Sequence, residues 1–218
     1  MQFDLFHAPL RFDSVEGAVE AMQALSDDPL AAAGTNMVVY RGAIDAPLIV
    51  IGEAPGAEED RQRMPFVGPS GKLLDQILIS AGFDPDTDVF VTNAAFRRPP
   101  GNRRPTAAEI EFYRPYLLEL IRLVDPDVIM LAGAAAVEAV LEDNRPMKDL
   151  RGRWQHWNGR LVMPVFHPAY LLRNPSRTPG SPKALMWDDV REVRRKLDEM
   201  GAVGSAAQSG RGTTGRKH

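Results

Sequence analysis

Residues 47–56, PLIVIGEAPG, join a short apolar run to a turn rich in glycine and proline. A run that is hydrophobic without alternation predicts a strand covered on both faces, as in a parallel sheet. Three further apolar runs have the same character: DVFVTNA at 88–94, DVIMLAG at 127–133 and LVMPVFHP at 161–168. The sequence therefore predicts four buried strands that end in turns.

Segments with helical periodicity separate these strands. Apolar spacing predicts helices after Ser14, over 70–82, over 134–141 and over 181–201. Thr106 and Glu109 have the spacing of a capping box, which predicts a helix start there, and Pro115 is expected to break or kink that helix. The alternation predicts an α/β fold, a three-layer α/β/α arrangement with a central, mainly parallel four-stranded sheet.

The chain has 218 residues, of which 44% are hydrophobic and 25% charged, as in an ordinary globular protein. We expect residues 1–200 to form a single catalytic domain with one core. Residues 201–218 are rich in glycine, serine, threonine and basic residues and are expected to be a disordered tail.

Composition excludes several classes of function. The chain has no cysteine, which rules out disulfides, thiolate nucleophiles and metal clusters held by thiolates. Its four histidines are scattered, so we predict no metal site and no cofactor. We find neither an apolar run of the ~20 residues that a membrane span needs nor a secretory signal, and expect a cytoplasmic monomer. Because the net charge is -3, a polyanionic partner would have to meet a local basic patch.

Polar side chains stand where three of the predicted strands end. Glu53 follows the first strand, Asn93 ends the second and His167 ends the fourth. Ligands of such sheets bind beyond the carboxyl ends of the strands, which favours a common site for these residues. A structural role competes with this interpretation, because a buried asparagine often caps a turn and a lone histidine is more often structural.

Two neighbouring loops carry further candidates. The turn GEAPGAEED at 52–60 is too acidic for phosphate, and its acids are either solvated, as suits Glu58 best, or include a carboxylate that orients water or stabilises a cation. In RMPFVGPSGK at 63–72, Phe66 is either a core anchor or a platform for a stacked ring. Ser70 and the amides of the helix that starts there are candidates to hold a phosphate.

Arginines cluster in two segments. RRPPGNRRP at 97–105 is a basic, proline-stiffened loop without an acid, and YLLRNPSR at 170–177 adds Arg173 and Arg177. A charge run is usually a solvated face, but beside a strand-end cleft it suits a phosphate backbone. Leu171 and Leu172 lie between these arginines and His167, where an apolar side chain can wedge into a base stack.

GEAPGAEED, PFVGPSGKLL, TN..FRRPPGNRRPT and HPAYLLR resemble, in order and spacing, the motifs of the uracil-DNA glycosylase superfamily. They are most similar to its family 4, the thermostable iron-sulfur branch, and the similarity runs from about residue 48 to 173. The resemblance implies a compact α/β/α enzyme of base excision repair. Such an enzyme flips uracil from DNA into a pocket and hydrolyses the N-glycosidic bond, without lyase activity.

The resemblance also implies how the base is held. Phe66 would stack on the uracil, and Asn93 would hydrogen-bond its polar edge and thereby exclude cytosine. Backbone amides near Ala54 would help to hold the base. Gly56 would line the side where thymine carries its methyl group. From their places beside the predicted cleft, we expect contacts with the uracil-containing DNA from Arg98, Arg103, Arg104 and Arg173, with Ser70 and Leu171.

The implied chemistry needs a donor on one side and a carboxylate on the other, because the base leaves as an anion and the sugar becomes cationic. His167 would stabilise the negative charge on the departing uracil oxygen. Glu53 would position water or support the cationic sugar, and Glu59 is a further carboxylate candidate.

The chain departs from family 4 at the iron-sulfur cluster. The four cluster cysteines would fall near Leu25 and Asp28, on Arg97 and near Tyr113, and none is present. We predict that the cluster is absent and that these side chains pack or pair instead, for example Asp28 with Arg97, to pin the same loops. No histidine occupies the region where a covalently trapping branch carries its nucleophile, and the GDPG turn of a broader branch is missing. We therefore expect narrow specificity for uracil rather than removal of a broader set of deaminated bases.

Two other functions stay open. A non-catalytic nucleic-acid-binding module would keep the fold and the arginines, but it gives no reason to retain Glu53, Asn93 and His167 together. A hydrolase of free nucleosides would use the strand-end site, but it has no need for two arginine loops.

Overall fold

The computed structural model describes residues 10–202, and a six-stranded sheet forms its centre. The strands are β1 (Arg41–Gly42), β2 (Leu48–Gly52), β3 (Val89–Asn93), β4 (Val128–Ala132), β5 (Gln155–Trp157) and β6 (Arg160–Val165), in the order β1-β3-β2-β4-β6-β5. The four central strands are parallel, and β1 and β5 pair antiparallel at the edges. The predicted fold is confirmed, and the edge strands add to the predicted four.

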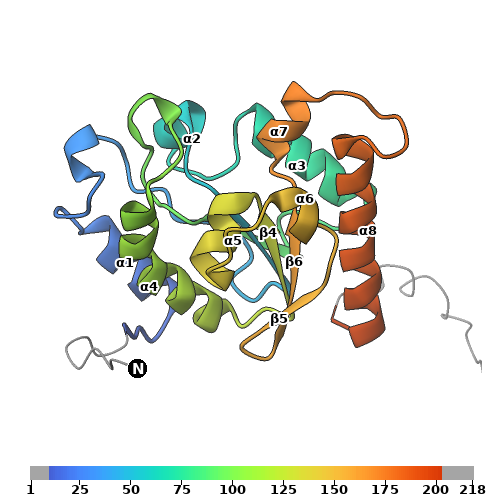
Figure 1. Cartoon of the computed structure of the whole chain (residues 1–218). Coiled ribbons are helices and arrows are strands. Elements are labelled where there is room, and N and C mark those ends of the chain that lie inside the picture. The colour runs from blue at the N-terminus through green and yellow to red at the C-terminus, as the bar shows by residue number, and fades with distance from the viewer. Residues whose placement is uncertain (1–9, 203–218) are drawn as a thin grey trace, which may run out of the picture.

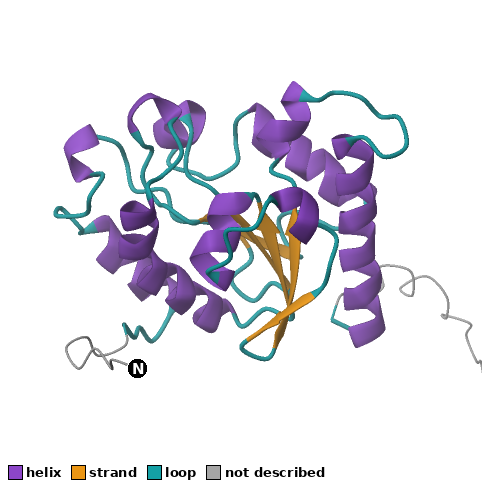
Figure 2. Cartoon of the chain, in the orientation of Figure 1, coloured by secondary structure: helices purple, strands orange, loops and turns teal. Residues whose placement is uncertain are grey.

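Within residues 10–202, eight α-helices surround the sheet (Figures 1 and 2). They are α1 (Val15–Gln23), α2 (Ala57–Gln62), α3 (Pro69–Ser80), α4 (Ala107–Val124), α5 (Ala134–Leu141), α6 (Met147–Leu150), α7 (Pro168–Arg173) and α8 (Pro182–Met200). Two short 3₁₀ helices, η1 (Ala31–Ala33) and η2 (Pro100–Asn102), lie in loops.

The sheet has a separate apolar core on each face. Along β2, Ile49 and Ile51 pack toward α1, α4 and α5, while Leu48 and Val50 pack toward α3 and α8. Figure 1 shows α1 and α4 on one side of the sheet and α8 on the other. Both faces are therefore buried, which is why the strands are continuously apolar.

Helix α4 differs from the prediction at Pro115. The helix runs unbroken from Ala107 to Val124 with Pro115 inside it. A proline inside a helix costs about 3 kcal/mol. Tyr113, Leu117 and Leu120 are fully buried around it, and their packing offsets this cost.

The strand ends bring distant segments together. Gly52 and Asn93 are register partners in the ladder of β2 and β3, so the residues that follow these strands start side by side. His167 follows β6 two strands away from β2. The C-terminal tail predicted over 201–218 lies outside the described residues, except for Gly201, which caps α8, and Ala202.

Candidate active site

A cavity of about 370 Å³ lies at the carboxyl ends of the parallel strands. It brings together nine of the residues that the sequence singled out: Glu53, Ala54, Gly56, Glu59, Phe66, Ser70, Asn93, Arg103 and His167. Arg98, Arg104, Leu171 and Arg173 are outside its lining. A larger cavity of about 960 Å³ also touches Phe66 but reaches none of Glu53, Asn93 and His167. The candidate chemistry therefore belongs to the smaller cavity.

Phe66 forms a wall of this cavity in a demanding backbone conformation. Its φ of 54° lies in the left-handed region, which is uncommon for an aromatic residue, and its side chain is buried. Gly71 makes this position accessible, because a Cβ there would lie 1.8 Å from the Phe66 carbonyl oxygen. The Phe66 ring centroid lies 5.9 Å from that of His167. The ring is thus held in place and faces the histidine.

Asn93 carries the polar group at the floor of the cavity. It is 1% exposed, and its Nδ2 has no hydrogen-bond partner among residues 10–202. Gly52 leaves room for it, since a Cβ there would lie 2.5 Å from Asn93 Oδ1 and 2.3 Å from Phe66 Cζ. A buried amide without a partner costs about 1–3 kcal/mol, so this group is poised for a ligand that accepts a hydrogen bond.

His167 is fixed as a donor by its position at the start of α7. Its Nδ1 accepts a hydrogen bond from the Ala169 N–H at 3.1 Å, so the proton of the neutral ring is on Nε2. Burial chiefly, and Arg173 in addition, lower the pKa of His167 to about 4. Gly133 lies beside the ring, where a Cβ would lie 3.1 Å from His167 Cβ. The imidazole is therefore neutral at pH 7.

This pKa makes stability depend on pH. The pKa of His167 is about 4 in the folded protein against 6.5 in the unfolded chain, so the unfolded state binds the additional proton between these values. We expect the folded protein to lose about 2–3 kcal/mol of stability as the pH falls from about 6.5 to 4. Urea unfolding as a function of pH measures this loss.

The matched reference for that titration is His167→Asn, which keeps an acceptor for the Ala169 N–H but does not titrate. The difference in unfolding free energy between the two proteins isolates the histidine from the carboxylates that titrate in the same range. Parallel pH dependences of the two proteins would contradict the assignment.

Glu53 lines the same cavity as His167 and Asn93. Burial raises its pKa, while Arg104 and Arg173 counteract this effect. Its carboxylate accepts no hydrogen bond within the described part of the chain, although its carbonyl accepts one from the Ala95 N–H at 3.0 Å. A half-buried carboxylate without a partner is available to a water molecule or a developing positive charge.

Glu59 is occupied by the backbone around it. Its Oε1 accepts from the N–H groups of Val67 and Gly68 at 3.0 and 2.7 Å, and its Oε2 accepts from the Gly56 N–H at 3.2 Å. The carboxylate thereby connects the turn after β2 with the loop of Phe66. Glu58 is exposed and pairs with Arg61, as expected for a solvated acid.

The predicted pair of Asp28 and Arg97 is confirmed. Arg97 Nε lies 2.8 Å from Asp28 Oδ2, and the Asp28 side chain is fully buried. Arg97 also donates to the carbonyl of Leu25, at 2.9 Å, and the hydroxyl of Tyr113 donates to Asp28. The four positions at which the resemblance would place cysteines are thus joined by hydrogen bonds. They do not fit an iron-sulfur cluster, because thiolate ligands are missing and Arg97 lies between them.

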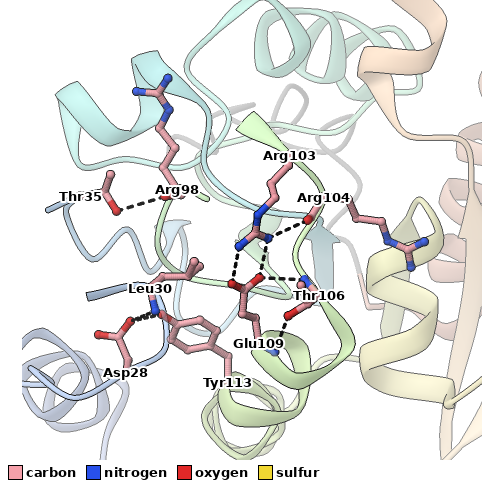
Figure 3. A network of polar contacts seen from close by, with 9 residues as sticks. All are labelled: Asp28, Leu30, Thr35, Arg98, Arg103, Arg104, Thr106, Glu109 and Tyr113. Atoms are coloured by element: carbon pink, nitrogen blue, oxygen red, sulfur yellow. Dashed lines mark hydrogen bonds and ion pairs between the residues drawn. The ribbon is translucent and has the colours of Figure 1, made fainter. Parts of the chain in front are cut away.

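The other arginines of the loop pair with acids elsewhere in the chain, and Figure 3 shows the pair of Arg103 with Glu109. Arg103 makes two hydrogen bonds to Glu109, at 2.8 and 2.6 Å, and Arg104 Nη2 lies 2.6 Å from Glu138. Arg98 donates to Asn102 at 2.6 Å, its Nη1 lies 3.9 Å from Asp60 Oδ2, and it points away from the Glu109 pair. Glu109 also closes the predicted capping box with Thr106. The loop is thus held by its own guanidinium groups, which stay partly exposed.

Helix α7 exposes a different leucine from the one predicted. Leu171 is fully buried in the core between α3 and α8, whereas Leu172 is 44% exposed. Arg173 is exposed and has no ion pair within residues 10–202. Of the two leucines, Leu172 is therefore the one whose side chain is available to a partner.

Comparison with known proteins agrees with this architecture. The profile of the Uracil DNA glycosylase superfamily matches residues 39–191. A type-4 uracil-DNA glycosylase of Thermotoga maritima is 34% identical over 193 residues, covering 88% of this chain and 98% of the relative. Enzymes of the same name from Sulfurisphaera tokodaii and Saccharolobus solfataricus are 32% and 35% identical, covering 84% and 74% of this chain and 84% and 76% of theirs.

The chain belongs to the uracil DNA glycosylase superfamily. Within it, the similarity extends over most of the chain to proteins named type-4 uracil-DNA glycosylases. None of the helices in residues 10–202 combines the length and apolar character that crossing a membrane requires.

Proposed function

We propose that this protein is a monofunctional uracil-DNA glycosylase that acts on uracil-containing DNA. The observation that carries the proposal is the unpartnered Nδ2 of Asn93 at the floor of a cavity that Phe66 and His167 also line. Uracil presents a carbonyl oxygen and an N–H on one edge, which match the Nδ2 donor and the Oδ1 acceptor of a single amide. Cytosine presents the reverse pattern there, so the same amide disfavours it.

The proposed reaction breaks the bond between C1′ of the sugar and N1 of the base. Both electrons leave with the uracil, and His167 Nε2–H donates to the oxygen on which the negative charge develops. Glu53 stabilises the positive charge on the sugar and orients water for addition at C1′. The water oxygen bonds to C1′, and its proton passes through Glu53 to the solvent or the departing base. Electrostatic stabilisation of this kind supplies a large part of an enzymatic rate enhancement.

The loops around the cavity hold these groups in place. Glu59 acts through the two loops it connects, and its contacts fix Gly56 beside the base and Phe66 over it. Ser70, at the second position of α3, and the amides of that helix start are positioned for a phosphate. Leu172 takes the wedge role that the sequence analysis gave to Leu171. We propose a single domain and a monomer as the working unit.

Arg98 is proposed to contact a phosphate, together with Arg103, Arg104 and Arg173. Each phosphate contact contributes about 0.9 to the slope of log binding constant against log salt for duplex DNA. We expect Arg98→Ala to reduce this slope by about that amount and to weaken binding to all sequences alike. Fluorescence anisotropy of a labelled duplex over a salt series measures it.

The matched control for Arg98 is Arg11→Ala, which removes an exposed arginine beside Arg160, at the amino ends of the parallel strands. It should leave the slope unchanged. An unaltered slope in Arg98→Ala would remove Arg98 from the phosphate contacts.

The function is tested with end-labelled duplexes that carry uracil, thymine or cytosine at one position. After incubation, alkali cleaves the strand at abasic sites, and a parallel sample without alkali reports lyase activity. We expect alkali-dependent scission of the uracil duplex alone. Binding of all three duplexes without scission would favour the non-catalytic module instead.

A further inference from the structure

We propose that one face of α8 is a secondary binding surface for single-stranded DNA flanking the base in the cavity. This surface, the α8 stripe, consists of Lys183, Trp187 and Arg191 together with Arg177 from the preceding loop. These residues line a shallow cavity of about 250 Å³, separate from the candidate active site. The inference rests on the proposed function.

The repeat of the helix places charged and aromatic side chains in alternation along one face of α8. Lys183, Trp187 and Arg191 are four residues apart in α8, so successive turns place them on the same face. Arg177 comes from the segment between α7 and α8 and lines the same cavity. A flat apolar ring is thus surrounded by cations from two segments of the chain.

The cations of the stripe are largely free to meet a partner. Arg177 and Lys183 form no ion pair within residues 10–202. Arg191 pairs with Asp188 at 3.1 Å, with both side chains exposed, and Asp188 is the acid among the residues that line the cavity. An exposed pair of this kind contributes little to stability and is readily exchanged for a phosphate. The stripe therefore has a net positive charge, opposite to that of the whole chain.

Trp187 has the features of a stacking platform. It packs in part against the core between α3 and α8, while another part of its surface lines the cavity. Its Nε1–H makes no hydrogen bond within the described residues, unlike that of Trp154, which donates to Glu192 at 3.0 Å. Aromatic rings beside cations bind single-stranded nucleic acid because every base offers a flat face. A duplex offers no such face, which favours an unpaired strand.

The α8 stripe is connected to the candidate active site through α7 and the loop that follows it. Arg173, at the end of α7, is near enough to lower the pKa of His167 and to oppose the raised pKa of Glu53. The chain runs from there through Arg177 to the start of α8, and α7 packs against α8 (Figure 1). A strand that leaves the cavity past Arg173 would therefore meet the stripe.

The test compares two single-stranded substrates with one uracil each. One carries about three nucleotides on either side and the other about twelve, which brackets site sizes of roughly 4–16 nucleotides. We expect Trp187→Ala to lower kcat/KM on the long substrate by about 5- to 100-fold, the loss of one stacked base, and to leave the short substrate within about twofold. Trp187→Phe should keep most of the activity on the long substrate. Trp157→Phe, in β5, is the control and should change neither.

A second measurement does not depend on hydrolysis. In the variant with Trp154→Phe and Trp157→Phe, Trp187 is the remaining tryptophan, and a uracil-free single strand should quench its fluorescence in a salt-dependent manner. Quenching in a protein that releases no uracil would support the stripe and contradict the proposed function. Hydrolysis without quenching, or an equal loss on both substrates in Trp187→Ala, would overturn the stripe.

Discussion

Replacing His167 with alanine is expected to lower kcat on a uracil-containing oligonucleotide by about 10²–10³-fold, with a much smaller change in KM. In the proposed reaction, the Nε2–H of His167 donates to the base oxygen whose negative charge grows as the bond breaks. A group that interacts more strongly with the transition state than with the bound substrate affects turnover rather than binding. Single-turnover kinetics with excess enzyme, over a range of enzyme concentrations, separate the two quantities.

The comparison variant for this measurement is His167→Asn. The Nδ1 of His167 also caps α7, and loss of a cap costs about 1 kcal/mol, so alanine removes two interactions at once. Asparagine retains an acceptor for the Ala169 N–H but cannot reach the base with a donor. We expect His167→Asn to unfold at the wild-type temperature and to be as slow as the alanine variant. A loss of less than tenfold in kcat for both variants would contradict the role of His167.

Removing the carboxylate of Asp28 is expected to destabilise the protein by about 3–5 kcal/mol. Asp28→Ala leaves the charge of Arg97 unpaired in an environment where its side chain is 13% exposed, and it leaves the hydroxyl of Tyr113 without its acceptor. Arg97 keeps its hydrogen bonds to the carbonyls of Leu25 and Thr35, so the loop that carries the other arginines loses one of several attachments to the N-terminal segment. Urea unfolding, with the midpoint and the slope both fitted, measures the change.

Two controls separate this network from an ordinary surface pair. Asp188→Ala breaks a pair with Arg191 in which both side chains are exposed, and it should leave the midpoint unchanged. The triple variant with Asp28→Leu, Arg97→Met and Tyr113→Phe removes every charged partner together and should recover most of the stability lost in Asp28→Ala. A stability of Asp28→Ala close to wild type would show that the network does not hold the loop.

The central sheet could be predicted from the sequence because strands buried on both faces leave continuous apolar runs. The edge strands β1 and β5 have two and three residues, too few for any pattern. The unbroken course of α4 at Pro115 could not be predicted. The packing of Tyr113, Leu117 and Leu120 that offsets the proline depends on core residues from distant parts of the chain.

At the site, Glu53, Asn93 and His167 were predictable from their places at strand ends. Gly52 and Gly133, which make room for Asn93 and His167, lie at the same strand ends. The local sequence does not show which side chain packs in the space that a Cβ would occupy at these glycines. The acid that holds Arg104 could not be assigned either, because Glu138 is 34 residues from its partner.

The choice between Leu171 and Leu172 has a different origin. Helix α7 has six residues, so its apolar pattern does not determine which of two adjacent leucines faces the core. The pairing of Asp28 with Arg97 was predictable only because the family resemblance placed distant positions together. The structure adds the hydrogen bond of Arg97 to the Leu25 carbonyl and that of the Tyr113 hydroxyl to Asp28.

The proposed function requires that a base is released in the cavity that Asn93 and His167 line. The decisive measurement is the amount of free uracil that the purified protein releases from an oligonucleotide with a single uracil, compared with free cytosine from the matched cytosine strand. We predict one free uracil per oligonucleotide and no cytosine, with His167→Ala slower in proportion to its kcat. Tight binding of the uracil strand without free uracil would contradict the account.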